Sequence, residues 1–153
     1  MSASILQYTS QSSVQTLREG LAEYYEHNPA LLDPAGMDPR AARLFSQHDA
    51  AHVVFGCDTS LRGETLIDTW TIFASTIGLR GYLEYLKLPQ VNELFARTGA
   101  LRIASEMLRC LPDIARVVWR SRRLRRKWPW QGWGEHLERP LAGIRDDFGI
   151  LVV

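Results

Sequence analysis

The chain has little of several features that would narrow its class. Only two of its 153 residues are cysteines, Cys57 and Cys110, too few for a disulfide framework, which favours a reducing compartment. Its 18 Lys and Arg residues nearly balance 17 Asp and Glu residues, so no net field directs it toward nucleic acid. Residues 1–13 lack the basic start of a signal peptide and the Arg-rich character of a transit peptide. We therefore expect no targeting segment and a cytoplasmic protein.

Long hydrophobic runs are also missing. The most apolar helical stretch, from Leu66 to Leu79, has 14 residues and contains Asp68, whereas a membrane-spanning helix needs about 20 apolar residues. With 46% hydrophobic and 23% charged residues, the composition indicates one ordinary domain over residues 1–153 with a core of its own.

Apolar residues recur at helical spacing, and no stretch alternates as a strand would. The pattern predicts an all-α, single-domain helical bundle of about six to seven helices. The first helix is expected from near Ser12, with a Ser12-x-x-Gln15 cap, to Asn28. Further helices are expected over 39–55, from near Glu64 to about Leu79, over 81–88, over 91–97 and near the C-terminus. The helical pattern over 100–127 should be kinked or split at Pro112.

The most informative motif is His48-Asp49-Ala50-Ala51-His52, followed by Glu64. Histidines four apart lie on one face of a helix, so both imidazoles can reach one ion. Asp49 lies about 100° away at the edge of that face, and Glu64 can return after a turn as an oxygen ligand. Two histidines with one or two carboxylates form the ligand set of a catalytic divalent metal site.

The surrounding residues predict how this motif is presented. Asp38 and Pro39 are suited to begin a helix that Gly56 would end. Residues 57–63 form a turn in which Asp58, Thr59 or Ser60 caps the next helix near Glu64. Cys57 is either an accessory ligand or, as the residue type favours, a small buried side chain.

The motif His48-Asp49-x-x-His52-x11-Glu64, with Gly56 and the Gly63-Glu64 pair, resembles the signature of the fourth Coq protein of ubiquinone (coenzyme Q) biosynthesis. A weaker likeness covers residues 133–150, which resemble the final amphipathic helix of that family, although Pro140 departs from its pattern. The resemblance implies an all-helical, membrane-associated protein whose His48, Asp49, His52 and Glu64 are metal ligands and catalytic residues.

The same resemblance implies a function. Members act on polyprenylated benzoquinone precursors and remove the ring C1 carboxyl group oxidatively. The expectation is therefore a metal-dependent C1-decarboxylase, a lyase, with zinc as first choice of cofactor and Mg, Mn or Fe as alternatives. Other ubiquinone biosynthesis proteins are expected partners, and assembly as a homodimer stays open.

Several alternatives compete with this hypothesis. The histidine pair can be a structural core cluster without metal, or a metal there can activate water for hydrolysis. HD phosphohydrolases need further His and Asp ligands that the chain does not offer in an evident pattern. The non-enzymatic alternative is a scaffold that binds a lipid-like quinone intermediate between helices and presents it to other enzymes at the membrane.

A second motif is the basic, tryptophan-rich stretch of residues 119–133. Six of the eight residues from 120 to 127 are Arg or Lys, and Trp119, Trp128, Trp130 and Trp133 adjoin them. Arginine is attracted to anionic lipid and tryptophan to the membrane interface, so the stretch predicts peripheral contact with the inner face of a membrane. A solvated helix face with core tryptophans is equally compatible, and nucleic-acid binding is disfavoured by the near-neutral chain.

Overall fold

The computed structural model describes residues 6–31 and 36–153, which form eight α-helices, two 3-10 helices and no strand. The all-α prediction is confirmed, with one helix more than the upper expectation. Most of the loop expected around residues 33–36 lies outside the described residues. The helices are α1 (Leu17–His27), α2 (Pro39–Phe55), α3 (Leu61–Ala74), α4 (Gly78–Tyr85), α5 (Pro89–Thr98), α6 (Ala100–Arg109), α7 (Leu111–Ser121) and α8 (Leu141–Phe148), with 3-10 helices η1 (Gln7–Thr9) and η3 (Trp133–His136).

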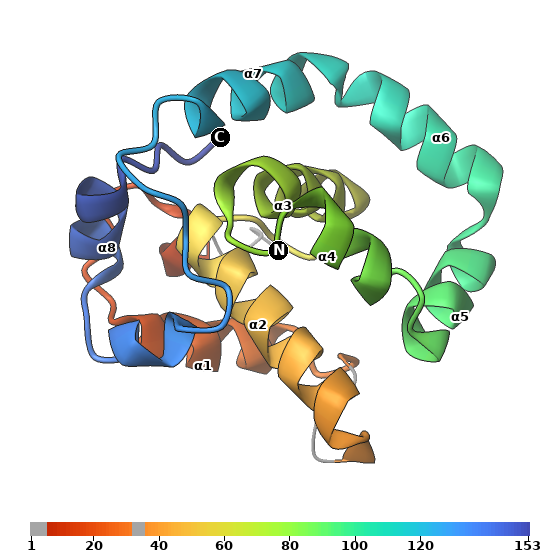
Figure 1. The fold of residues 1–153 in the computed structure, drawn as a ribbon, viewed down its shortest axis with the longest axis horizontal. Coiled ribbons are helices and arrows are strands. Elements are labelled where there is room, and N and C mark those ends of the chain that lie inside the picture. The colour runs from red at the N-terminus through yellow and green to blue at the C-terminus, as the bar shows by residue number, and fades with distance from the viewer. Residues whose placement is uncertain (1–5, 32–35) are drawn as a thin grey trace, which may run out of the picture.

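Helix α3 lies at the centre of the arrangement and contacts α2, α4, α6 and α7. Figure 1 shows α5, α6 and α7 following the outside of the molecule in an arc around α3 and α4. On the other side, α2 packs against α1 and α8. The two helices that carry the metal motif, α2 and α3, are therefore neighbours inside the bundle.

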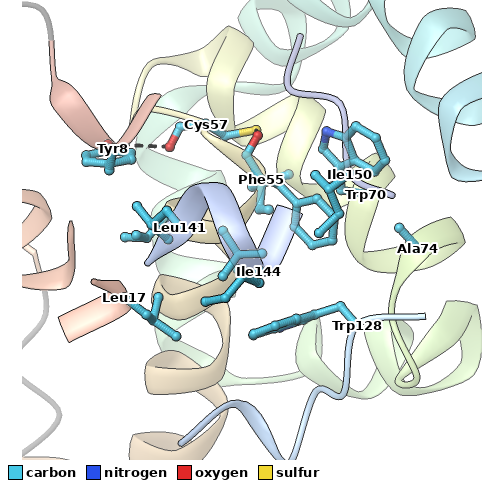
Figure 2. Packing of buried hydrophobic residues seen from close by; sticks show 14 of the residues in the cluster. Tyr8, Leu17, Phe55, Cys57, Trp70, Ala74, Trp128, Leu141, Ile144 and Ile150 are labelled. Atoms are coloured by element: carbon cyan, nitrogen blue, oxygen red, sulfur yellow. Dashed lines mark hydrogen bonds between the residues drawn. The ribbon is translucent and has the colours of Figure 1, made fainter. Parts of the chain in front are cut away.

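The core lies where α1, α2, α3 and α8 meet. The rings of Phe55 and Trp70 stack with centroids 4.8 Å apart, which ties the end of α2 to α3. Leu141 and Ile144 of α8 and the indole of Trp128 complete this fully buried cluster (Figure 2). Burial of several such side chains, each worth about 1.5–3 kcal/mol, fixes the end of α2 in place.

The ends of α2 and the start of α3 form as the sequence predicts. The Asp38 carboxylate accepts hydrogen bonds from the backbone N–H groups of Arg40 and Ala41, and Gly56 ends the helix with a left-handed φ of 69°. The Ser60 hydroxyl caps α3 by accepting from the Gly63 N–H. A Cβ at Gly63 would lie 2.0 Å from the Asp58 carbonyl oxygen, so only glycine allows this close approach.

Other boundaries differ from the predictions. Helix α1 begins after Thr16, not near Ser12, because Thr16 and Glu19 form a reciprocal capping box. Pro112 splits the run from Ala100 into α6 and α7 as predicted, but α7 ends at Ser121, well before Lys127. Beyond it the chain is held by tertiary contacts, since the Trp128 N–H donates to the Ala74 carbonyl.

The C-terminal segment is not one amphipathic helix. Residues 133–136 form η3, and Pro140 lies directly before α8. Proline has no N–H to donate and fixes its φ, so it suits this position and prevents a helix from continuing through it. The last α-helix is therefore only eight residues long.

Arg145 of α8 is completely buried and joins three segments. Its Nε donates to the Val54 carbonyl at 2.9 Å and its Nη2 to the Val53 carbonyl at 2.9 Å, at the end of α2. The carbonyls of Tyr8 and Ser10 accept further hydrogen bonds from the same guanidinium. Burial lowers the pKa of Arg145 to about 10, so it stays charged at neutral pH.

No helix among residues 6–31 and 36–153 combines the length and the apolar character needed to cross a membrane.

Candidate metal centre

The structure brings together three of the four predicted ligands. His48 and His52 lie one turn apart on α2, and Glu64 lies in the first turn of α3. One ligand atom from each of these residues lies within 4.8 Å of the other two. The expected return of Glu64 to the histidine pair is therefore observed, and this group could hold a metal ion.

Each of the two histidines has a ring nitrogen in this group that forms no hydrogen bond. The Nε2 atoms of His48 and His52 are buried, and neither has a hydrogen-bond partner. Buried polar atoms normally have partners, because leaving one without costs about 1–3 kcal/mol. Two such atoms beside a carboxylate fit a site built for a cation.

A backbone contact sets the tautomer of His52. Its Nδ1 lies 3.1 Å from the Cys57 carbonyl oxygen, which can only accept a hydrogen bond. The proton of the neutral ring therefore resides on Nδ1, and the Nε2 lone pair faces Glu64. Metal-bound histidines are commonly oriented through the second ring nitrogen in this way.

The distance between His52 and Glu64 also fits two ligands of one ion. Their Nε2 and Oε1 atoms are 3.4 Å apart, longer than the roughly 2.7–2.9 Å of a charge-assisted hydrogen bond. Ligand bonds of about 2.1 Å in a tetrahedral arrangement would place two donor atoms about 3.4 Å apart.

The charges of this pair support each other. Burial disfavours a proton on His52, but Glu64, the Cys57 carbonyl and Asp49 together outweigh it and raise the pKa of His52. For Glu64, burial opposes ionisation, yet His52 and His48 together outweigh it and lower the pKa. Without metal, the site therefore attracts a proton, and a divalent cation would compete with that proton for the same atoms.

The structure does not bring Asp49 into this group. Its carboxylate accepts hydrogen bonds from the hydroxyls of Tyr24 at 3.3 Å and Tyr25 at 2.9 Å, both on α1. One residue further along α2 turns its side chain about 100° away from that of His48 and toward α1. Burial raises the pKa of Asp49 despite these hydrogen bonds. Asp49 thus links α1 to α2 behind the two histidines.

Cys57 also lies outside the group. It is buried, as its residue type suggested, and its contribution is the backbone carbonyl that orients His52. Burial raises the pKa of its thiol, which keeps the sulfur protonated.

Two contacts of His48 escaped the sequence reasoning. The Oδ1 atom of Asp68 lies 3.9 Å from Nε2 of His48, and the ring of Tyr85 stacks on the imidazole with centroids 5.1 Å apart. The spacing Glu64-x-x-x-Asp68 was a visible signal, because it places both carboxylates on one face of α3. Nothing comparable pointed to Tyr85, which comes from α4 by tertiary packing.

A cavity of about 350 Å³ opens beside these residues. His48, Glu64 and Asp68 lie in its wall, together with Glu106 and several threonines, and most of the remaining lining is apolar. The apolar part comes from α3 to α7 and includes Ile72, Phe73, Leu86, Val91, Leu94, Phe95, Ile103, Met107 and Ile114. The site thus adjoins a mostly apolar space.

The basic, tryptophan-rich stretch is divided between core and surface. Trp128 and Trp130 are buried, whereas Trp119 is 50% exposed, with Arg123 stacked 3.7 Å from the centre of its ring. Arg120 donates to the Leu151 and Val152 carbonyls. Part of the stretch that was expected to contact a membrane is therefore engaged in contacts within the protein.

Exposed apolar side chains gather on helices before that stretch. Leu101, Leu108 and Leu111 of α6 and α7 are 89%, 68% and 54% exposed. Arg102 and Arg109 directly follow two of them in the sequence. Figure 1 shows α6 and α7 on the outer arc of the molecule.

No model of a known protein family matches the chain, and no curated protein and no solved structure matches it.

Proposed function

We propose that this protein is a metal-dependent enzyme of ubiquinone biosynthesis that removes the ring C1 carboxyl group of a polyprenylated hydroxybenzoate. The observation that carries the proposal is the pair of buried, unpartnered Nε2 atoms of His48 and His52 beside Glu64, at the wall of a mostly apolar cavity. The substrate class and the reaction come from the motif's resemblance to the fourth Coq protein.

In this proposal His48, His52 and Glu64 hold the ion, and the Cys57 carbonyl keeps Nε2 of His52 available to it. Zinc is the first candidate, and Mg, Mn and Fe are the alternatives. A bound divalent ion would act as a Lewis acid for the carboxylate or phenolate oxygen of the ring. The apolar walls of the cavity hold isoprenoid carbons and exclude water from the ring.

The proposed reaction is a two-electron oxidation. The bond between C1 and the carboxyl carbon breaks and carbon dioxide leaves, while a C1–O bond forms with an oxygen atom from water. Two electrons and the released protons pass to an external acceptor, for which dioxygen is the simplest candidate. The product is the corresponding C1-hydroxylated ring.

Metal content and turnover test the proposal together. We expect near-stoichiometric metal by elemental analysis in the purified wild type, and its loss in His52→Ala and Glu64→Ala. His27→Ala is the matched control, because His27 is exposed and bonds only within α1. The metal-loaded wild type should release carbon dioxide from a carboxyl-labelled polyprenyl-hydroxybenzoate. A metal-free wild type, with variants that fold equally well, would overturn the proposal.

The mostly apolar lining of the cavity favours one second candidate, a scaffold that binds the prenylated intermediate without converting it. The same substrate separates the two functions. Saturable binding without release of carbon dioxide, with metal and an electron acceptor present, would identify the scaffold.

We also propose that the protein contacts a membrane peripherally, and that α6 and α7 extend the contact predicted for residues 119–133. Leu101 and Leu108 supply apolar area, and the neighbouring arginines attract anionic lipid headgroups. Leu101→Glu with Leu108→Glu should abolish co-sedimentation with vesicles containing phosphatidylserine, whereas Val14→Glu, equally exposed on the N-terminal segment, should not. Equal sedimentation of all three proteins would refute this contact surface.

A further inference from the structure

We propose that Asp68 is the fourth protein ligand of the metal centre, and that Asp49 is not a ligand. This inference rests on the proposed metal site and assigns a residue that the motif does not contain. The site then consists of two histidines on α2 facing two carboxylates on α3.

The register of the two helices carries the inference. His48 and His52 are one turn apart on α2, and Glu64 and Asp68 are one turn apart on α3. His52 faces Glu64 at 3.4 Å, and His48 faces Asp68 at 3.9 Å. Each histidine thus has a carboxylate opposite it; Glu64 is already at a separation suited to two ligands of one ion, whereas Asp68 lies outside the group of three and must move toward His48 to join it.

The unpartnered nitrogen of His48 is the independent observation. Its side chain is only 8% exposed, and its buried Nε2 has no hydrogen-bond partner although Asp68 lies nearby. The stacked ring of Tyr85 fixes the orientation of this imidazole. The Asp68 side chain is 30% exposed at the cavity wall, so a small rotation can bring it onto an ion held by His48.

Charge balance favours the same assignment. A divalent cation held by one carboxylate and two neutral imidazoles keeps a net charge of +1 beside a mostly apolar cavity, where charge is poorly solvated. A second carboxylate makes the site neutral. Asp49 supplies this charge less well, because its oxygens already accept hydrogen bonds from two tyrosine hydroxyls of α1.

Calorimetric titration of metal-free protein with Zn²⁺ and with Mn²⁺ tests the inference. We expect Asp68→Asn to weaken binding at least tenfold and Asp49→Asn to change it less than threefold. Asp68→Glu should recover part of the affinity. Thermal unfolding of each metal-free variant checks that the protein is folded.

Co²⁺ gives a readout that a distant charge would not change. Its visible absorption depends on the atoms bound directly to it, so we expect Asp68→Asn to shift the band of the wild type and Asp49→Asn to leave it unchanged. If Asp68→Asn binds metal with wild-type affinity and has an unaltered Co²⁺ spectrum, the inference about Asp68 is overturned, while the proposed function still stands. If the wild type binds none of the three ions, the proposed function fails, and the fourth ligand with it.

Discussion

Arg145 carries a positive charge among backbone carbonyls. Four carbonyl oxygens from the N-terminal segment and the end of α2 accept its hydrogen bonds. A guanidinium offers five donors in a planar fork, which no other side chain reproduces. Two carbonyls of the last turn of α2 thereby accept hydrogen bonds from another helix, and that of Val53 also accepts one from the Gly56 N–H at 3.3 Å.

We therefore expect Arg145→Met to lower the free energy of unfolding by about 2–4 kcal/mol, because it removes the side-chain donor from four carbonyl oxygens, of which only those of Val53 and Ser10 keep a backbone donor. Relief from burying a charge offsets only part of this loss. Urea denaturation measures the effect. Arg122→Met is the matched control, since Arg122 is exposed, and we expect a change within about 0.5 kcal/mol. Equal effects of the two variants would contradict the structural role.

His136 makes stability depend on pH. Its ring packs against those of Trp128 and Phe148, with centroids 5.1 and 5.5 Å away, and burial and nearby arginines lower its pKa. As the pH falls through the unfolded value of about 6.5, the unfolded chain binds a proton before the folded protein does. Stability due to the neutral ring is therefore present above that pH and lost below it.

We expect the denaturation midpoint of the wild type to fall more between pH 7 and pH 5 than that of His136→Phe. The variant retains an aromatic ring at this position but cannot bind the proton. Both proteins share all carboxylates, so the difference isolates the imidazole. A parallel decline of the two midpoints would show that His136 does not contribute to the pH dependence.

At the scale of residues, helical spacing was enough to bring His48 and His52 together, and the predicted turn over residues 57–63 allowed Glu64 to return to them. Helical spacing did not decide between Asp49 and Asp68, because both lie within one turn of a ligand. The choice depends on which helix packs against each face of α2. Two tyrosine hydroxyls of α1 bind the Asp49 carboxylate, whereas Asp68 of α3 lies 3.9 Å from His48.

At the scale of elements, the end of α2 depends on Gly56. Its φ of 69° is costly for other residues, and a Cβ there would lie 3.0 Å from a methyl group of Val152 and 3.2 Å from the Thr9 carbonyl. This turn places the Cys57 carbonyl against His52. Gly56 therefore both ends α2 and allows the turn that orients His52.

We expect Gly56→Ala to destabilise the protein by about 1–3 kcal/mol through left-handed strain and crowding. Gly143→Ala is the control, because Gly143 lies within α8 with open space around its Cα. Alanine there should be neutral or stabilise by up to about 1 kcal/mol. Thermal unfolding compares the two, and a Gly56→Ala protein as stable as the wild type would contradict the prediction.

The helix boundaries that local signals predicted correctly have strong caps or breakers. Asp38, Gly56 and Pro112 all act where the sequence placed them. The start of α1 was wrong because two overlapping cap patterns compete, and Thr16 with Glu19 prevails over Ser12. The end of α7 was wrong because arginines favour helix, whereas tertiary hydrogen bonds from Arg125 and Trp128 hold the chain in another course.

At the scale of the whole molecule, a bound ion would join α2 to α3 and stabilise the fold. At a free metal concentration 100 times the dissociation constant, binding to the folded state alone adds about 2.7 kcal/mol. For a chain of this size, we expect the melting temperature to rise by about 5–10 °C. Differential scanning calorimetry with metal and then with excess chelator measures the shift. A shift of the same size in Glu64→Ala would place the ion elsewhere.

The sequence could not reveal the cavity or the division of the tryptophans. Six helices contribute to the cavity, and their relative positions depend on packing between residues far apart in the chain. Trp128 and Trp130 follow a basic run that looks solvent-facing, yet backbone contacts with residues 74–76 bring both indoles into the core. The amino-acid composition therefore predicts neither the cavity nor which tryptophans are buried.

The partners of Arg145 also set an order of events during synthesis. The ribosome makes Val53 and Val54 some 90 residues before the arginine that binds their carbonyls. The final turn of α2, which positions His52, therefore waits for α8 to emerge before its hydrogen bonds are complete. Nascent chains stalled between α7 and α8 should thus hold this turn loosely, and a mature metal pocket arises only after α8 has left the exit tunnel.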